Sequence, residues 1–354
     1  MQSFVRSDQC VAPILMIREP SLASWVDPMT DRPGLAQRVL NGDRRALARL
    51  LTYIENDDPV GLTALDTLYP HTGHAHLIGV TGPPGGGKSS LVNELIRAWR
   101  AEGKQVAVIA IDPSSPLTGG ATLGDRIRML EWYDDPGVFI RSMASRSFGS
   151  GLAQNALALA HAFDAAGFDP IVLETVGTGQ DEVGIASLAL TTLLVQVPGT
   201  GDSVQTLKAG SLEIGDVIVV TKADQPGARE LAQDLRRLRT LTFEPAAGDV
   251  ALWEPPIVKT SAAAREGISE LVAAIGSHLG WLERTGQRAA REQRIAAAEV
   301  SNRVQAELRR HLAGLQTTST SHGARFDAMM QRVLAREATP WRAAQALVEQ
   351  LTNT

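Results

Sequence analysis

A glycine-rich stretch followed by a lysine and a serine, GPPGGGKS at residues 82 to 89, has the spacing of a phosphate-binding loop. Glycines allow several backbone N–H groups to converge on phosphate oxygens where a helix begins. Lys88 would then reach the β- and γ-phosphates, and the hydroxyl of Ser89 would bind Mg²⁺. The sequence therefore predicts a nucleoside triphosphate site made by Gly82, Pro83, Pro84, Gly85, Gly86, Gly87, Lys88, Ser89 and Ser90.

Three acidic residues are candidates for the magnesium shell. Glu174 ends the short apolar run at residues 171 to 173, and Asp112 ends another at residues 106 to 111. Ligands of parallel sheets lie at the carboxyl ends of the strands, where a carboxylate helps to hold Mg²⁺ in proteins with a phosphate loop. Taken alone, Asp112 and Asp125 also fit turn or cap residues. Beside a phosphate loop, we expect Ser89, Asp112, Asp125 and Glu174 to surround Mg²⁺.

The segment after Glu174, TVGTGQDEVG, has the composition of a loop that responds to the γ-phosphate. Gly177 follows Glu174 by three residues, an arrangement in which the glycine N–H contacts that phosphate and is released when it is lost. Gln180 is a candidate for orienting the attacking water, and a solvated glutamine is the alternative. The catalytic candidates are therefore Lys88, Glu174 and Gln180.

The run TKAD at residues 221 to 224 follows the apolar segment VIVV and predicts recognition of guanine. A carboxylate at Asp224 can accept hydrogen bonds from N1–H and the 2-amino group of guanine, whereas the N1 of adenine carries no proton. The stem of Lys222 can lie along the base. Backbone N–H groups of Ser261, Ala262 and Ala263 would meet the guanine O6. Thr221 stands where most GTPases have Asn, and we expect GTP or GDP rather than ATP.

Short β-rich runs alternate with helical patterns between about residues 76 and 280. The expected strands cover residues 76–81, 105–111, 171–174, 191–197, 217–221 and 256–260, and the expected helices cover 89–101, 152–166, 228–238 and 268–279. Such alternation predicts a parallel sheet with helices on both faces. The fold class is therefore α/β, a P-loop NTPase fold with a doubly wound, mostly parallel sheet and helical extensions at both ends.

Helical segments flank this nucleotide domain. Residues 34–75 read as an N-terminal helical region in which Asp43 can cap a helix, and residues 1–33 remain unassigned. Residues 281–354 read as a C-terminal helical arm, with a stripe at i, i+4 spacing formed by Val300, Val304, Leu308 and Leu312. That stripe either packs on its own domain or forms a dimer, and both interpretations stay open.

Composition narrows the class of protein. The chain has 354 residues and a net charge of -5, so its overall charge does not indicate nucleic-acid binding. Cys10 is the single cysteine, so no disulfide can form within the chain. We find no apolar run of the about 18 residues that a membrane helix needs, and no signal-peptide core. A cytoplasmic enzyme or switch is expected. The tract containing His71, His74 and His76 invites a metal interpretation, but a solvated linker is favoured.

Four long runs together resemble the MeaB/ArgK group of G proteins, which includes the methylmalonic aciduria type A protein. They are GVTGPPGGGKSSL, AIDPSSPLTGGATLGDRIRM, ETVGTGQDEVG and VPGTGDSVQTLKAGSLEIGDV. The resemblance extends from about residue 35 to beyond residue 310. It implies a GTP-hydrolysing chaperone of an adenosylcobalamin-dependent acyl-CoA mutase, which gates cofactor delivery and protects or reactivates the mutase.

The same resemblance implies roles for individual residues. Asp112, Asp125 and Glu174 fall at family acids around Mg²⁺, and a coupling loop carries Asp202, Gln205 and Lys208. The family further implies a homodimer formed through the arm, an adenosyltransferase as an additional partner, and no directly bound cobalamin. From the residues alone, the loop at 198–208 equally fits an ordinary surface loop.

Two other functions remain as alternatives. A small-molecule kinase or transport-linked ATPase, the older ArgK label, requires an acceptor pocket and tolerance of adenine, and Asp224 argues against the second. A GTPase metallochaperone for another metalloenzyme usually carries a metal-capture motif rich in Cys or His, which only HTGHAH at residues 71–76 approaches. Within the favoured function, methylmalonyl-, isobutyryl-, ethylmalonyl- and 2-hydroxyisobutyryl-CoA mutases all fit as partners.

Overall fold

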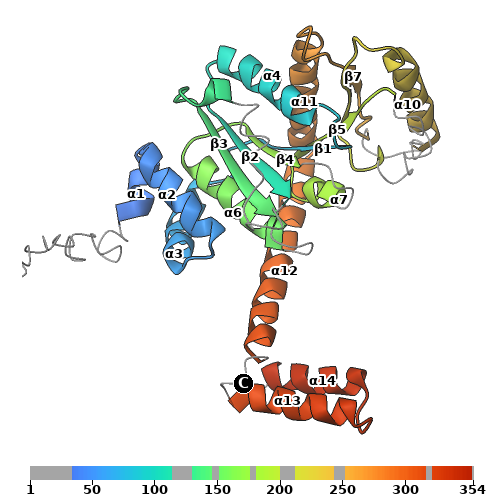
Figure 1. Cartoon of the computed structure of the whole chain (residues 1–354). Helices are drawn as coiled ribbons and strands as arrows, with labels where there is room; N and C mark the ends of the chain where they lie inside the picture. Colours follow the sequence, from blue (N-terminus) through green and yellow to red (C-terminus); the bar gives the residue numbers. More distant parts are fainter. Residues whose placement is uncertain are drawn as a thin grey trace, which may run out of the picture.

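The computed structural model describes residues 34–113, 130–145, 151–175, 181–199, 212–242, 252–315 and 321–352. Their centre is a seven-stranded sheet in the order β3-β2-β4-β1-β5-β6-β7, with every neighbouring pair parallel (Figure 1). The predicted α/β class is confirmed. The strands are β1 (Leu77–Thr81), β2 (Val106–Pro113), β3 (Val138–Ser145), β4 (Ile171–Thr175), β5 (Thr191–Gln196), β6 (Val217–Val220) and β7 (Ile257–Lys259).

Helices cover both faces of the sheet because successive strand residues point to opposite sides. Val172 packs in the cluster formed with α4 (Lys88–Ala101) and α11 (Ile268–Arg284), whereas Leu173 packs in the cluster formed with α6 (Gly151–Ala165) and α7 (Asp181–Ala186). A third cluster joins α10 (Ala228–Thr242) to β5 and β6. Burial on both faces explains why the strands are nearly continuous apolar runs.

The N-terminal helices pack beside α6. They are α1 (Gly34–Leu40), α2 (Arg44–Glu55), α3 (Pro59–Leu68) and the short 3-10 helix η2 (Tyr69–His71). The expected cap is present, since the Asp43 carboxylate accepts from the N–H groups of Arg45 and Ala46 at 2.9 and 3.0 Å. The fully buried Leu50 and Leu51 belong to the same cluster as α6, which ties this region to the sheet.

The C-terminal arm consists of α12 (Gln287–Leu315), α13 (Ser321–Leu334) and α14 (Pro340–Thr352). Helix α12 runs away from the sheet and carries α13 and α14 at its far end (Figure 1). Val300, Val304 and Leu308 are 63, 53 and 49 % exposed, so packing of this stripe on its own domain is wrong for these three residues. The side chain of Leu312 lies outside the described part.

The sequence pattern did not predict β3 or α7. Strand β3 lies at the edge of the sheet and mixes apolar residues with serines and one charged residue, Arg141, which weakens its signal. Tertiary contacts account for its polar residue, because Arg141 forms an ion pair with Glu55 of α2. The guanidinium of Arg44 lies 4.7 Å from the centroid of the Phe139 ring on the same strand. Within the described ranges, no helix has the length and apolarity needed to cross a membrane.

Candidate nucleotide-binding site

The predicted phosphate loop connects β1 to α4, directly beside the end of β5. Gly82 adopts φ 138°, and a Cβ there would lie 2.3 Å from the carbonyl oxygen of Val195. Gly87, immediately before α4, adopts φ 85°. Both positions therefore need glycine, one for close approach to β5 and one for a left-handed backbone. The loop ends at the N-terminus of a helix, where backbone N–H groups favour anions.

Lys88 lies across this loop. Its side chain is only 5 % exposed, and Nζ donates to the carbonyl oxygens of Gly82 and Pro83 at 2.8 and 2.9 Å. These carbonyls hold the ammonium group over the glycines. An approaching phosphate would therefore meet a positive charge that is already positioned at the loop.

Ser89 and Glu174 lie together although 85 residues separate them. Strands β1 and β4 are neighbours with Val80 opposite Glu174, so the acid reaches the start of α4. The Ser89 hydroxyl donates to Glu174 Oε1 at 2.6 Å, and the two residues are 7 and 3 % exposed. A hydroxyl and a carboxylate are oxygen ligands of the kind that Mg²⁺ prefers. The residues present fit a magnesium ion.

Several predicted site residues lie outside the described part of the chain. Asp112 is in β2, which pairs with β4, but its side chain is not described. The other such residues are Asp125, Gln180, Asp202, Gln205 and Lys208. Their roles stay predictions.

The predicted base-reading residues Asp224 and Ser261 meet after β6 and β7. The Ser261 hydroxyl donates to Asp224 Oδ1 at 2.5 Å, and the N–H of Ala223 donates to the carbonyl of Thr260 at 3.0 Å. The hydrogen bond from Ser261, followed by that from the N–H of Asp224, lowers the pKa of the Asp224 carboxyl. At neutral pH this group is a carboxylate that only accepts hydrogen bonds, as guanine recognition requires.

The backbone of Ser261 departs from the prediction. Its N–H donates to the carbonyl of Glu266 at 3.0 Å, so it is already engaged and not directed to a base. Among the described residues, the N–H groups of Ala262 and Ala263 donate to no backbone carbonyl. Of the three predicted O6 donors, these two keep that function as candidates.

Thr221 links the two halves of the site. Its hydroxyl lies 2.5 Å from the carbonyl oxygen of Gly86, to which it donates, and its N–H donates to the carbonyl of Gln196 at 2.9 Å. From the sequence, Thr221 was notable only because most GTPases have Asn at this position of the guanine-binding run. In the structure its single hydroxyl fixes the phosphate loop against the segment that carries Lys222 and Asp224.

The histidine tract contains two kinds of residue. His71 and His74 are exposed, as a solvated linker requires, whereas His76 is 7 % exposed and its Nε2 lies 2.6 Å from Thr191 Oγ1. The linker interpretation is therefore wrong for His76. In the described ranges, no group of three or more His, Cys, Asp or Glu side chains is arranged to hold a metal.

A cavity of about 360 Å³ lies at the opposite end of the sheet, where Leu77, Ile171 and Leu190 stand at the starts of strands. Its polar lining is engaged: Asp164 accepts from the N–H groups of Gly73 and Ala75, and the pair His161–Glu299 is 3.1 Å apart. An acceptor for a kinase must approach the γ-phosphate. Because the phosphate loop follows the other end of β1, this cavity does not provide such a place.

Comparison with known proteins agrees with this geometry. The family described as methylmalonyl-CoA mutase-associated GTPase MeaB matches residues 47–317. A putative GTPase of Pyrococcus abyssi is 43% identical over 317 residues, which are 90% of this chain and 96% of that protein. A fused isobutyryl-CoA mutase of Cupriavidus metallidurans is 37% identical over 227 residues, which are 63% of this chain and 21% of that protein.

Among solved structures, one described as LAO/AO transport system kinase superposes with a TM-score of 0.65 at 25% sequence identity. The superposition covers 93% of this chain and all of the other. The phosphate loop, the parallel sheet and the named GTPases indicate that the protein hydrolyses GTP. The chain belongs to the MeaB family of P-loop GTPases.

Proposed function

We propose that this GTPase is a chaperone of an adenosylcobalamin-dependent acyl-CoA mutase, methylmalonyl-CoA mutase or a close relative. In this function it gates cobalamin delivery and protects or reactivates the mutase. The observation that carries the proposal is the 227-residue match to a protein named fused isobutyryl-CoA mutase, of which the match is 21%. Joining two proteins in one chain keeps them at a high effective concentration, which favours proteins that act together.

The described contacts support a division of tasks in GTP hydrolysis. Lys88 would exchange the carbonyls of Gly82 and Pro83 for phosphate oxygens. Ser89 and Glu174, with Asp112 and Asp125 as further candidates, would hold Mg²⁺. When bound, Mg²⁺ neutralises charge that develops on the phosphates. Gln180 would orient the attacking water.

Asp224 would bind the guanine edge while Lys222 lies along the base and the N–H groups of Ala262 and Ala263 reach O6. The ionised state of Asp224 and its fixed position against Ser261 support this assignment. The ligands of the protein are then GTP, GDP and Mg²⁺, without directly bound cobalamin. Recognition of guanine disfavours the alternative of a transport-linked kinase or ATPase.

Replacing Ser89 by alanine is expected to raise the Mg²⁺ concentration for half-maximal GTP turnover about 10- to 100-fold, a range typical for the loss of one supporting group at a metal site. Ser89→Ala removes the hydroxyl that lies 2.6 Å from Glu174, whereas Ser89→Thr retains it and serves as the matched control. Turnover is measured against Mg²⁺ concentration at saturating GTP. An unchanged dependence in Ser89→Ala would remove Ser89 from the metal site.

The loop that begins after β5 is proposed to carry the nucleotide state to the mutase, with Asp202, Gln205 and Lys208 as its responsive residues. Its start, Pro198-Gly199, follows the strand that touches Gly82, so it adjoins the phosphate loop. A loop carries such a signal only if its contacts differ between the GTP and GDP states. The mutase must in turn alter nucleotide affinity.

Lys208→Ala should leave basal GTP turnover near the wild-type value and reduce stimulation by the mutase about tenfold, which lies within the range of typical coupling. GTP turnover is compared with and without methylmalonyl-CoA mutase, and with isobutyryl-CoA mutase in parallel. The control is Arg236→Ala, at an exposed position of α10. Equal stimulation of wild type and Lys208→Ala would exclude this loop as the coupling element, and no stimulation by any acyl-CoA mutase would contradict the chaperone function.

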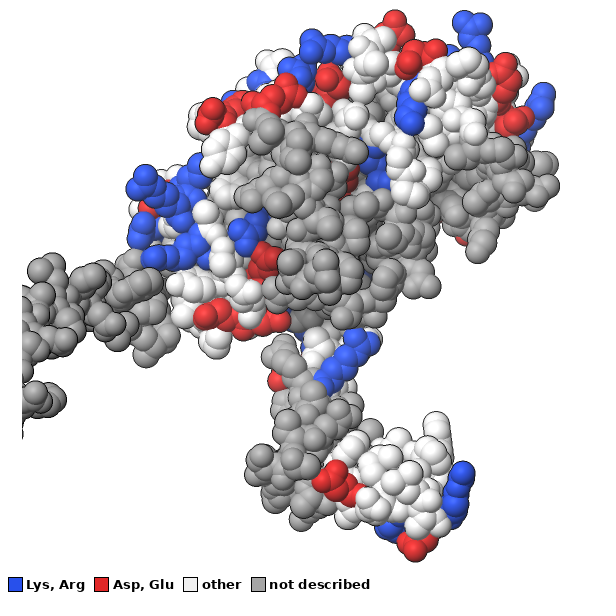
Figure 2. Space-filling view, in the orientation of Figure 1, with Lys and Arg blue, Asp and Glu red and all other residues white. Residues whose placement is uncertain are grey.

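The arm is proposed to form a homodimer. Val300, Val304 and Leu308 form an exposed apolar stripe on α12, and the surface of α13 and α14 in Figure 2 is largely uncharged. A second copy would remove this surface from water. Sedimentation of the full chain tests the proposal, and monomers at micromolar concentration would contradict it.

The remaining parts of the proposal concern organisation and location. We assign residues 34–75 to the N-terminal helical region, 76–280 to the nucleotide domain and 281–354 to the arm, with 1–33 unassigned. Because α11 continues to Arg284, the boundary of the arm moves to Gln287, where α12 begins. We place the protein in the cytoplasm, with an adenosyltransferase as a further partner. Affinity capture with a non-hydrolysable GTP analogue tests the partners, because a mutase should co-purify.

A further inference from the structure

Three central strands begin at one buried polar network. His76 directly precedes β1, Thr191 is the first residue of β5, and Asp216 directly precedes β6. At their other ends, the same strands lead into the phosphate loop, the proposed coupling loop and the guanine-reading run. Whatever is attached to this network is therefore attached to the strands that carry the nucleotide site.

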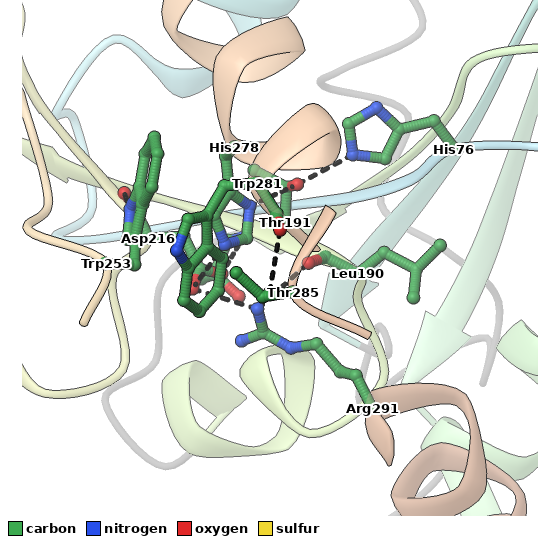
Figure 3. A network of polar contacts seen from close by, with 10 residues as sticks. His76, Leu190, Thr191, Asp216, Trp253, His278, Trp281, Thr285 and Arg291 are labelled. Atoms are coloured by element: carbon green, nitrogen blue, oxygen red, sulfur yellow. Dashed lines mark hydrogen bonds and ion pairs between the residues drawn. The ribbon is translucent and has the colours of Figure 1, made fainter. Parts of the chain in front are cut away.

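The polar groups form a chain of close contacts (Figure 3). His76 Nε2 lies 2.6 Å from Thr191 Oγ1, Thr191 Oγ1 lies 2.8 Å from His278 Nδ1, and His278 Nε2 lies 3.3 Å from Asp216 Oδ1. The contact between His278 Nε2 and Asp216 lacks hydrogen-bond geometry, but the negative charge of a carboxylate at this distance favours the tautomer with the proton on Nε2. Its Nδ1 then accepts from the Thr191 hydroxyl, which in turn accepts from His76.

Both histidines stay neutral at physiological pH. Burial lowers the pKa of His76 and of His278 to about 3 in each case. Burial also raises the pKa of Asp216, and the charge and hydrogen bond of Arg291 oppose that rise, so Asp216 depends on Arg291 for its ionised form. Its Oδ2 accepts from the N–H of Thr192 at 2.7 Å, which holds the carboxylate at the start of β5.

The counter-charge comes from the arm. Arg291, in the second turn of α12, donates through Nη1 to Asp216 Oδ1 at 2.9 Å and to the carbonyl oxygen of Leu190 at 3.0 Å (Figure 3). Arg288, one turn earlier, donates to the carbonyl of Gly73 at 3.0 Å. The base of α12 is therefore bonded directly to the segments that precede β1, β5 and β6.

Aromatic rings shield the network from water. The Trp253 indole N–H donates to the carbonyl oxygen of Asp216 at 2.7 Å, and its ring centroid lies 4.8 Å from that of His278. Trp281 stacks on His278 at 5.8 Å with an interplanar angle of 18°, and its ring centroid lies 5.7 Å from that of Trp253. Exclusion of water strengthens the attraction between Asp216 and Arg291.

We propose that Asp216 and Arg291 form a latch that fixes the direction in which α12 leaves the nucleotide domain. The helix starts after the break at Thr285-Gly286, where Gly286 adopts φ 71°. Further along, the pair Arg303–Asp57 is longer, at 3.4 Å, and partly exposed, and exposed pairs contribute little. Between the two pairs, Ile295 packs against the cluster of α6, and Glu299 lies 3.1 Å from His161. Arg291 and Asp216, with side chains 18 and 13 % exposed, form the most buried of these three pairs, so the strongest polar attachment of the arm is at its base.

The test measures the arm directly. In a Cys10→Ser background, spin labels at Glu102→Cys on the end of α4 and Gln305→Cys on α12 report the distance between the nucleotide domain and the arm. The wild-type chain should give one narrow distribution, and Arg291→Ala should at least double its width. Gln293→Ala, at an exposed position of the same helix, is the control and should leave the width unchanged. Equal widths for wild type and Arg291→Ala would overturn the latch.

Folding and charge are tested separately. GTP binding by Arg291→Ala shows whether its nucleotide domain is folded. If this variant fails to fold, Arg291→Lys replaces it. Lysine keeps the charge but has a shorter side chain, so the distance distribution should broaden partially. The distances require neither GTP hydrolysis nor a mutase, so they succeed or fail independently of the proposed function. A width for Arg291→Lys equal to that of wild type, with Arg291→Ala unfolded, would also overturn the proposal.

A pH dependence distinguishes the ion pair from simple packing. Burial raises the pKa of Asp216, and Arg291 opposes this rise, as does Arg294 at longer range. Burial lowers the pKa of the neighbouring His278, and of His76 behind Thr191, to about 3, below both pH values of the test. Without Arg291 the folded-state pKa of Asp216 lies further above its unfolded value. Stability is then present at low pH and lost as pH rises through the folded pKa.

The loss of melting temperature caused by Arg291→Ala should therefore be larger at pH 7 than at pH 5. In the Asp216→Asn background, Arg291→Ala should cause a similar, smaller loss at both pH values, because no buried charge remains. If Arg291→Ala lowers the melting temperature equally at pH 5 and pH 7 in the chain that retains Asp216, the ion pair is not the source of the latch.

Discussion

Replacing Lys88 by alanine is expected to lower GTP turnover by a factor of about 10²–10³, the loss typical for removal of one preorganised transition-state donor. The Nζ of Lys88 is already held at the phosphate loop by two carbonyl oxygens. Its charge would stabilise the charge that develops on the γ-phosphate, and alanine supplies no donor. Phosphate release at saturating GTP and Mg²⁺ measures the effect.

The control for this experiment is Lys104→Ala. Lys104 is exposed and pairs with Glu102 after α4, so its loss removes a charge without touching the phosphate loop. Circular dichroism and thermal melting in the absence of nucleotide establish that both variants fold. Wild-type turnover by a folded Lys88→Ala protein would refute the assignment of the loop.

Replacing Asp224 by asparagine is expected to weaken GTP binding by about 10²-fold and to create affinity for xanthosine triphosphate. The carboxylate accepts from N1–H and the 2-amino group of guanine, and a carboxamide cannot accept both. Xanthine has a 2-oxo group instead, to which the new amide can donate. The hydrogen bond from Ser261 keeps the side chain in place in either variant. Calorimetric titration with GTP, ATP and xanthosine triphosphate measures the change.

Asp234→Asn makes the same chemical change on α10, where Asp234 pairs with Arg237, and should leave nucleotide preference unaltered. Two results would exclude Asp224 as the guanine-reading residue: equal binding of ATP and GTP by the wild-type chain, or retained GTP preference in Asp224→Asn. The first would also favour the transport-linked kinase or ATPase.

Much of the nucleotide site was predictable because its signals are local. The glycines, Lys88 and Ser89 lie in one short run whose geometry follows from the strand before it and the helix after it. The apolar run ending at Glu174 identified a strand end, and parallel strands place their carboxyl ends together. The Ser89–Glu174 contact is the consequence, at 2.6 Å. The sequence alone therefore determined the fold class and the residues of the phosphate loop.

The tertiary structure decided features that depend on partners distant in the chain. Thr221 contacts Gly86 across 135 residues, and no local pattern indicated that its hydroxyl would link the phosphate loop to the guanine-reading run. On the edge strand β3, Arg141 is stabilised by its ion pair with Glu55 of α2. The N–H of Ser261 donates to the carbonyl of Glu266 and is not available to a base. Each depends on which surfaces meet after folding.

The base of the arm shows the same division. Helical spacing in the sequence predicted α12 and its apolar stripe, but could not decide whether the stripe is covered by its own domain. Nor did Asp216, His278 and Arg291 stand out among the other polar residues of the sequence. The ion pair between Asp216 and Arg291 joins residues that are 75 positions apart, so no local pattern indicates it. Periodicity reports which face of a helix is apolar, whereas burial and charge pairing depend on the three-dimensional neighbours that remove water from a side chain.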